Sequence, residues 1–181
     1  ITVGNGGAGV TAPNAGNPGD NSSIGAPGVA IADQPDYILA KGGGAGGSPY
    51  NVANGEAGGS GGGDAGGNSP PFGGLATQPT TNPSPLITDH GYPGGWSYPS
   101  SGYGPSGGGG AGEQGVNTPG NDPGGGDGGD GVPISGFEYP LIGLSPFEVF
   151  SPTNNHYGGG GGAGIYSTPA TDRTGAGGAG V

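Results

Sequence analysis

Blocks of glycine recur along the whole chain and constrain its fold more than any other feature. They lie at residues 42–47, 58–67, 107–112, 124–131, 158–164 and 175–180. With 53 Gly and 20 Pro among 181 residues, these two residue types make up about 40% of the chain, against roughly 12% in an average protein. Because glycine loses more conformational freedom on folding than any other residue, an ordered state here needs many compensating interactions.

The rest of the composition narrows the class of protein. Leu, Ile, Val and Phe together make up only about 14% of the chain, a level typical of disordered proteins. However, only 8% of the residues are charged, whereas disordered chains usually carry dense charge. The net charge is −11, with Lys41 and Arg173 as the only Lys or Arg residues. Nucleic acids and anionic membrane surfaces are therefore poor partners for this chain.

Two absences exclude further classes. The chain has no cysteine, which rules out disulfide frameworks, zinc–cysteine sites and thiol catalysis. No apolar run approaches the roughly 20 residues that a membrane-spanning helix needs, so we expect no membrane insertion. The chain begins at Ile1 rather than Met, and we expect it to be a piece of a longer protein.

The sequence predicts a helix-poor, all-β or irregular fold. Its longest stretches without Gly or Pro are six residues long, at 29–34 and 36–41, whereas isolated helices shorter than about 12 residues are marginal. Short extended segments remain possible, and the candidates are residues 1–3, 29–32, 37–40, 137–150 and 165–167. Collagen is excluded because no reading frame keeps Gly at every third position.

Glycine blocks have one ordered state that fits this composition. They can form polyglycine-II helices, which have three residues per turn and no internal hydrogen bonds. Several such helices packed side by side can satisfy each other's main-chain groups, because the absence of Cβ lets the backbones approach closely. We therefore expect a single glycine-rich domain over residues 1–181, made of polyglycine-II or extended segments with long proline-rich and aromatic loops.

Two inserts between the glycine blocks carry most of the aromatic side chains. They span residues 68–106 and 132–157. Large rings set among Ser, Gly and Asn are typical of adaptable binding loops, and the alternative is that they pack locally as small clusters. The candidate receptor-contact residues are Tyr92, Trp96, Tyr98, Tyr103, Phe137, Tyr139, Phe147 and Phe150.

Most short motifs are expected by chance at this glycine frequency. G-x-G-x-x-G occurs at Gly4 and Gly107, and G-x-S-x-G occurs around Ser60 and Ser106. The helix that either motif requires is not predicted after any of these copies. His90 and His156 have no acid or nucleophile at a recognisable spacing. We therefore predict no enzyme activity, no catalytic residues and no cofactor.

Three weaker signals concern modification and metal binding. Asp127 and Asp130 lie in a GGGDGGDG segment that loosely resembles glycine–aspartate calcium loops, although a solvated acidic turn explains them better. Asn21 begins an N-S-S sequon for N-glycosylation. The Pro/Ser/Thr-rich tract from Ser69 to Ser106 could be O-glycosylated.

Several segments resemble the glycine-rich domain of bacteriophage tail fibre and tail tip proteins. They are the opening ITVGNGGAG, the GNPGDNSSIG element, KGGGAGGSPYN, and the later glycine blocks that include HYGGGGGAGIY and the closing GAGGAGV. A looser likeness is to fibre-tip adhesins built from polyglycine-II helices. The two inserts are longer and more aromatic than that pattern. The resemblance implies a structural or receptor-binding protein on a virion tail, with a host surface receptor and other fibre subunits as partners, in a homo-oligomer for which a trimer is favoured.

Two other functions fit the composition. One is a self-assembling extracellular fibril protein, secreted or at the cell surface, with glycans on its Pro/Ser/Thr tract. The other is an antifreeze protein, which needs a regular face of small residues that the interrupted glycine spacing does not supply. Tandem copies of the segment would favour the fibril over the phage fibre.

Overall fold

The computed structural model describes residues 1–11, 14–24, 38–48, 54–66, 72–78, 90–97, 104–118, 124–133 and 156–163. These residues contain no α-helix, so the expected helix-poor fold is confirmed for this part of the chain. Accordingly, this part offers no helix of sufficient length and hydropathy to cross a membrane.

The regular strands are short and form two separate two-stranded sheets. Strand β1 (Ser22–Ile24) pairs antiparallel with β2 (Ile38–Ala40), and β3 (Val132–Pro133) pairs antiparallel with β4 (His156–Tyr157). The expected segment at 37–40 is thus confirmed over Ile38–Ala40 as β2, and residue 37 lies outside the described residues. From the expected segment at 1–3, Thr2 forms an isolated bridge with Ser23. The expected segments at 29–32, 137–150 and 165–167 lie outside the described residues.

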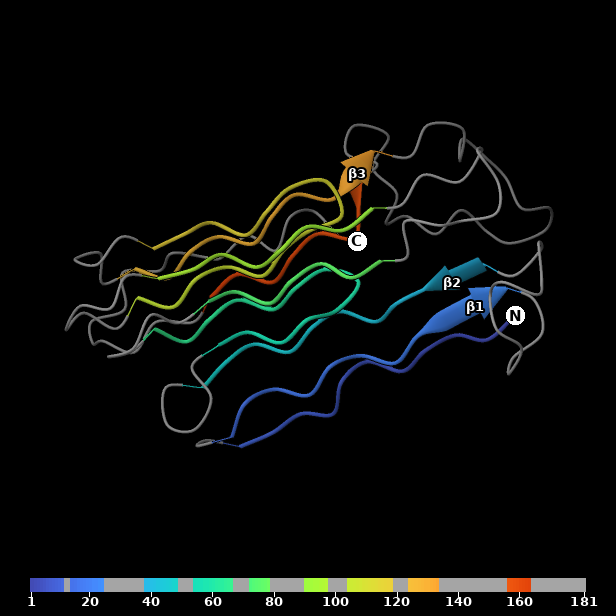
Figure 1. The fold of residues 1–181 in the computed structure, drawn as a ribbon, viewed down its shortest axis with the longest axis horizontal. Helices are drawn as coiled ribbons and strands as arrows, with labels where there is room; N and C mark the ends of the chain where they lie inside the picture. Colours follow the sequence, from blue (N-terminus) through green and yellow to red (C-terminus); the bar gives the residue numbers. More distant parts are fainter. Residues whose placement is uncertain are drawn as a thin grey trace, which may run out of the picture.

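Most of the described chain forms extended runs that lie side by side along one long axis (Figure 1). We call this assembly of runs the bundle. Successive runs alternate in direction, as the order of their hydrogen-bonded partners shows. The runs comprise residues 1–11, 14–24, 38–48, 54–58, 60–66, 72–78, 90–97, 104–110, 114–118, 124–133 and 156–163.

Hydrogen bonds between neighbouring runs recur at every third residue. The amide of Gly19 donates to Gly43 O and the amide of Gly16 donates to Gly46 O, both at 3.0 Å. Other pairs show the same spacing. The amides of Tyr92 and Gly95 donate to Gly110 O and Gly107 O, and the amides of Glu113 and Val116 donate to Asp130 O and Asp127 O. A β-strand repeats every two residues. The three-residue repeat therefore separates these runs from ordinary sheet strands.

The glycine content of a run follows the number of its neighbours. Run 60–66 hydrogen-bonds to five other runs, and a Cβ at Gly61, Gly62 or Gly63 would clash with backbone atoms of three different neighbours. Run 72–78 lies at an edge of the bundle: Gly73 and Gly74 face neighbours closely. A run with a three-residue repeat thus needs glycine only in the directions where another backbone lies.

Apolar burial contributes little to the bundle. Among the described residues the only buried hydrophobic side chains are those of Ala45 and Ala65. The other buried positions are glycines and small polar residues such as Ser48, Ser97 and Thr118. Order in this part of the chain therefore depends on main-chain hydrogen bonds between runs rather than on an apolar core.

The two ends of the bundle differ in the length of chain that joins the runs. One end, which we call the strand end, carries β1 to β4 (Figure 1). There the chain passes between residues 24 and 38, 78 and 90, and 133 and 156, and it makes short turns at 59 and 111–113. At the opposite end it passes between residues 11 and 14, 48 and 54, 66 and 72, 97 and 104, and 118 and 124. The three longest connections thus all leave the strand end.

Candidate functional site

Two of the predicted receptor-contact residues lie in run 90–97. The Tyr92 and Trp96 side chains are 45% and 39% exposed. Their backbones are fixed in the bundle: the Tyr92 amide donates to Gly110 O, and Trp96 O accepts from the amide of Thr118. Residues four apart do not share a direction in a three-residue repeat, so these two rings do not form one surface. Trp96 lies toward the end opposite the strands.

The remaining six candidates, Tyr98, Tyr103, Phe137, Tyr139, Phe147 and Phe150, lie outside the described residues. Chain connectivity still divides them. Tyr98 and Tyr103 belong to the connection between residues 97 and 104, at the end opposite the strands. The four others belong to the connection between 133 and 156, which begins and ends in the β3–β4 pair. Of the eight candidates, the structure therefore describes the surroundings of Tyr92 and Trp96 only.

A row of apolar side chains lies exposed on neighbouring edge runs. Phe72 and Leu75 are 61% and 67% exposed, and they share a direction because they are three residues apart. Run 72–78 is joined to run 90–97, which carries Trp96, by the hydrogen bond from the Gly94 amide to Gly74 O. Exposed apolar rows of this kind are typical of interaction surfaces.

Asp64 forms the main buried polar cluster of the described residues. Its carboxylate accepts hydrogen bonds from the amides of Gly66 and Ser97, at 2.9 and 2.5 Å. Its own amide donates to the hydroxyl of Ser106, which in turn donates to Gly95 O. Gly66 has a φ of 70°, a left-handed conformation suited to glycine, and ends run 60–66. The cluster therefore fixes the ends of three runs to one another.

Burial raises the pKa of Asp64 above its ordinary value, because it disfavours the charged carboxylate. The hydrogen bond from the Gly66 amide is the largest of the opposing contributions. Asp64 is not among the site residues predicted from the sequence. The signal that could have found it is a lone carboxylate inside a glycine block.

The serines of the two G-x-S-x-G motifs have structural partners. The Ser60 hydroxyl donates to Gly110 O at 3.0 Å, and the Ser106 hydroxyl donates to Gly95 O at 2.6 Å. Both hydroxyls thus hydrogen-bond to main-chain carbonyls of neighbouring runs, which explains these serines by packing.

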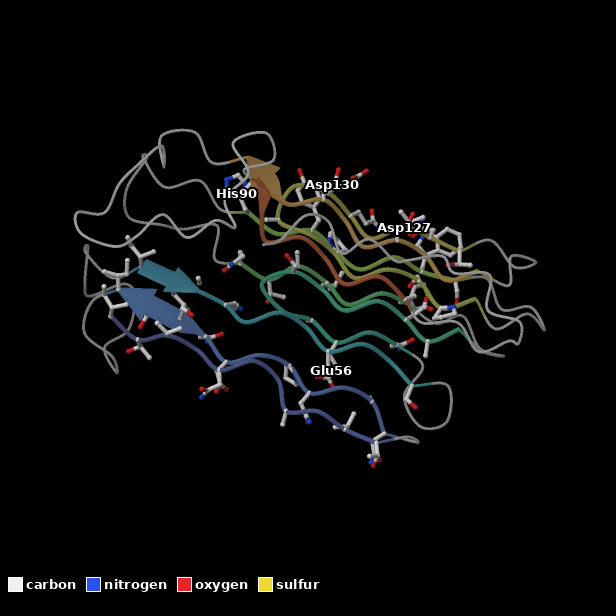
Figure 2. The ribbon with its side chains drawn as sticks, turned by 180° about the vertical axis from the view of Figure 1, so that it is seen from behind. Glu56, His90, Asp127 and Asp130 are labelled. Atoms are coloured by element: carbon white, nitrogen blue, oxygen red, sulfur yellow. The ribbon has the colours of Figure 1, made fainter. Side chains whose placement is uncertain are left out.

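The weaker predicted sites differ in exposure: in the tract from Ser69 to Ser106, Ser97 and Ser106 are buried. Asp127 and Asp130 are exposed, are three residues apart and project along one edge of the bundle, whereas His90 lies near the strand end (Figure 2). In the described part of the chain no three His, Asp or Glu residues gather in a way that could hold a metal ion. Asn21 is exposed, and its Oδ1 accepts a hydrogen bond from the Gly42 amide at 3.0 Å.

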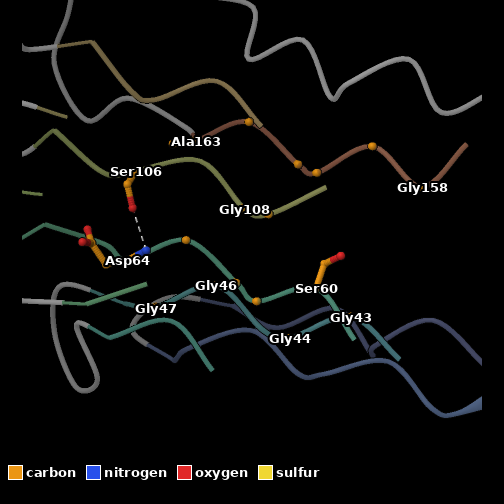
Figure 3. Close-up of a pocket in the computed structure, with 18 of the residues that line it drawn as sticks. Gly43, Gly44, Gly46, Gly47, Ser60, Asp64, Ser106, Gly108, Gly158 and Ala163 are labelled. Atoms are coloured by element: carbon orange, nitrogen blue, oxygen red, sulfur yellow. Dashed lines mark hydrogen bonds between the residues drawn. The ribbon is translucent and has the colours of Figure 1, made fainter. Parts of the chain in front are cut away.

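A groove of about 1050 Å³ runs along one side of the bundle. Its walls are four runs, 38–48, 60–66, 104–110 and 156–163 (Figure 3). The lining is mostly glycine, so main-chain N–H and C=O groups form most of its polar surface. Lys41, Gln78 and His90 contribute the larger polar side chains of the lining. No feature of the sequence pattern predicts this groove.

Comparisons with protein-family models, curated proteins and solved structures return no match to this chain.

Proposed function

We propose that this chain is a structural component of a bacteriophage tail fibre or fibre tip, in which a rigid polyglycine-II bundle carries receptor-binding loops at one end. The phage assignment rests on the sequence segments ITVGNGGAG and GNPGDNSSIG and on the repeated glycine blocks. The mechanical and recognition roles rest on the geometry of the bundle.

The three-residue repeat supports the polyglycine-II assignment. Polyglycine-II helices have three residues per turn and rise about 3.1 Å per residue, and their backbone groups point outward to neighbours. The partner spacing of runs 14–24 and 38–48 agrees with that period. Interior runs bonded to as many as five neighbours would resist bending, as a fibre component must.

The single observation that carries the recognition role is the unequal length of the connections at the two ends. At the strand end, two turns are short, at 59 and 111–113, whereas 13, 11 and 22 residues join the other runs, at 25–37, 79–89 and 134–155. At the opposite end, no connection between runs exceeds the six residues of 98–103. Binding residues are disproportionately found on long loops held by a rigid scaffold. We therefore place the receptor-binding surface at the strand end.

The test compares aromatic residues of the two ends. We expect the replacement of Tyr139, Phe147 and Phe150 with Ser to reduce binding of the purified protein to susceptible bacteria at least tenfold. The matched control replaces Trp96, Tyr98 and Tyr103 with Ser, which removes three aromatic rings near the other end. Binding would be measured by flow cytometry with labelled protein, and assembly by light scattering.

The two sets of variants separate the outcomes. Loss of binding only in the first set, with assembly unchanged, supports recognition at the strand end. Loss only in the control set places the receptor contact at the opposite end and contradicts the proposal. Undiminished binding in both sets removes the recognition role and leaves a purely structural one.

The alternative function, a self-assembling extracellular fibril protein, has one observation in its favour. The exposed row of Phe72 and Leu75 offers an apolar edge for lateral association. A fibril protein would polymerise without a phage particle, whereas a fibre component would form a closed oligomer. Electron microscopy of the purified chain distinguishes the two, because filaments of growing length support only the fibril.

A further inference from the structure

The groove has the shape of one missing run in the bundle. Run 60–66 hydrogen-bonds to five runs: 38–48, 54–58, 72–78, 90–97 and 104–110. Run 104–110 also hydrogen-bonds to five: 60–66, 90–97, 114–118, 124–133 and 156–163. In a close-packed array each helix has six neighbours, so both runs lack one. The groove lies beside both of them, between 38–48 and 156–163.

The backbone N–H and C=O groups of run 60–66 form hydrogen bonds toward five neighbouring runs, and the sixth direction has no partner run. Its carbonyls accept from three neighbours, and the amides of Gly61 and Gly62 donate to Tyr92 O and Glu56 O. The amides of Ser60 and Gly63, three residues apart, have no hydrogen-bond partner among the described residues. Both residues line the groove.

Run 104–110 shows the complementary pattern. Its amides at Gly107, Gly108 and Gly109 donate to three different neighbours. The carbonyls of Ser106 and Gly109 accept no hydrogen bond from any described residue, and both residues line the groove. The groove thus presents a row of donors beside a row of acceptors, each with the three-residue repeat of the bundle.

The outer walls of the groove have glycines that the present contacts do not require. A Cβ at Gly43 or Gly161 would meet no atom within 4 Å, and one at Gly46 would meet its nearest atom at 3.9 Å. All three residues line the groove. At the edge run 72–78, by contrast, positions without a backbone neighbour carry Phe72 and Leu75. Glycine on the groove walls keeps room for a further backbone.

The direction of a run in this position follows from its neighbours. Run 60–66 is antiparallel to run 104–110 but parallel to run 38–48, and run 156–163 is also antiparallel to 104–110. Three of the four walls therefore point the same way. Across run 60–66, edge run 72–78 points the opposite way, so alternation predicts that the missing run does too. A chain that turns back after Ala163 has this direction.

The chain beyond Ala163 contains a segment of the right length and pattern. Residues 175–180 read GAGGAG and are one residue shorter than run 60–66. A run in the groove would have two open sides and would need glycine at two positions in three. Edge runs show this as a glycine pair flanked by other residues, as in Phe72-Gly73-Gly74-Leu75 and Pro93-Gly94-Gly95-Trp96. Ala176-Gly177-Gly178-Ala179 has the same pattern.

We propose that the groove is a binding site for an extended glycine run and that residues 175–180 of the same chain occupy it, antiparallel to run 60–66. Gly177 and Gly178 face the groove floor, and Ala176 and Ala179 face outward. The carbonyls of this run accept from the amides of Ser60 and Gly63, and its amides donate to the carbonyls of Ser106 and Gly109. This proposal does not depend on the proposed role in host recognition.

The test compares inward and outward substitutions in the full chain. We expect Gly177→Val with Gly178→Val to block insertion, because a side chain cannot enter between backbones. The exchange of the Gly63 amide with solvent, measured by NMR, should then accelerate at least 100-fold. The matched control, Ala176→Val with Ala179→Val, adds side chains of the same type on the outward face and should leave that exchange rate within about threefold.

A second pair of variants tests the groove from its wall. Gly43→Val with Gly46→Val fills the groove and should also expose the Gly63 amide. Gly6→Val with Gly9→Val is its control, because Cβ atoms at Gly6 and Gly9 likewise meet nothing within 4 Å but these residues lie outside the groove. Equal effects of the two pairs would contradict the proposal.

Two further outcomes would overturn it. Free exchange of the Gly63 amide in the unaltered chain would show that no run fills the groove. Protection that falls on dilution would show that the run comes from a second molecule rather than from the same chain.

Discussion

At the scale of single residues, the packing of the bundle depends on whether the position that a Cβ would take at a glycine faces a neighbouring backbone. At Gly61, a Cβ would overlap the carbonyl oxygen of Gly74 and lie 2.9 Å from Gly94 N, and both obstacles are backbone atoms. At Gly6, a Cβ would meet nothing within 4 Å. The same residue type is therefore obligatory in one place and replaceable in the other.

This contrast gives a direct prediction for alanine substitutions. Gly61→Ala should lower the free energy of unfolding by at least about 3 kcal/mol, because two runs must separate to admit the methyl group. Gly6→Ala should change it by less than about 1 kcal/mol, and in the stabilising direction if the backbone conformation suits alanine. Urea denaturation of both variants measures the difference, and similar values for the two would contradict the observed packing.

The buried carboxylate of Asp64 predicts a dependence of stability on pH. Because its pKa is raised in the folded state, the folded chain holds this proton more tightly than the unfolded chain. The stabilisation is fully present below the unfolded pKa, near 4, and is lost as pH rises through the folded pKa. Other carboxylates also titrate in this window, so the comparison needs a variant.

Asp64→Asn removes the titration and keeps the shape. One of the two carboxylate oxygens, which accept from the amides of Gly66 and Ser97, becomes an NH2 group that can only donate. One buried amide is then unsatisfied, so the variant should be less stable at every pH, by about 1–3 kcal/mol. In addition, the difference in the free energy of unfolding between the unaltered chain and Asp64→Asn should shrink as pH rises above 4. Denaturation series between pH 3 and 7 test this, and a difference that grows with pH would show the opposite shift.

At the scale of elements, the glycine blocks predicted the interior runs well. Blocks 42–47, 58–67, 107–112, 124–131 and 158–164 all fall largely within described runs. Runs 60–66 and 104–110 bond to five neighbours each, and most of their glycines have no room for a Cβ. Residues 72–78 and 90–97 were assigned to an insert because of their Phe, Tyr, Pro and Trp residues. Their glycine pairs, Gly73-Gly74 and Gly94-Gly95, were the available signal, since an edge run needs glycine in only two directions of three.

The sequence could not show which runs are neighbours. Glycine blocks are interchangeable as patterns, so neither the groove nor the distant partners of Asp64 could be read from them. The alternation of direction, by contrast, follows from short connections such as residues 12–13, which cannot return the chain to its starting end. Of the candidate contacts, Tyr92 and Trp96 were placed at the surface, but their separation depended on the three-residue repeat.

The three-residue repeat predicts an unusual response to insertions. One glycine inserted after Gly62 rotates the following residues by a third of a turn and misdirects the carbonyls that accept from Gly47 and Ser106. Three inserted glycines restore the rotation and shift the run by about 9 Å. We expect the single insertion to lower the unfolding temperature more than the triple insertion, as measured by circular dichroism. The reverse order would contradict a threefold helix.

At the scale of the whole molecule, the small apolar core predicts a small heat capacity change. Exposed apolar surface raises the heat capacity on unfolding and exposed polar surface lowers it, with a usual net value of about 12–15 cal/mol/K per residue. Only Ala45 and Ala65 are buried hydrophobic residues among those described. We expect less than half the usual value per residue, measured by differential scanning calorimetry. A normal value would mean that an apolar core forms elsewhere in the chain.

The unequal ends of the bundle have a consequence for how such a protein changes over generations. Every substitution of a glycine adds a side chain, so we expect selection to hold the interior runs nearly constant wherever a Cβ would meet a neighbouring backbone. Residues 25–37, 79–89 and 134–155 connect runs at the strand end, and none of the hydrogen bonds described between runs involves them. Substitutions are therefore expected to accumulate faster in these connections than in the interior runs.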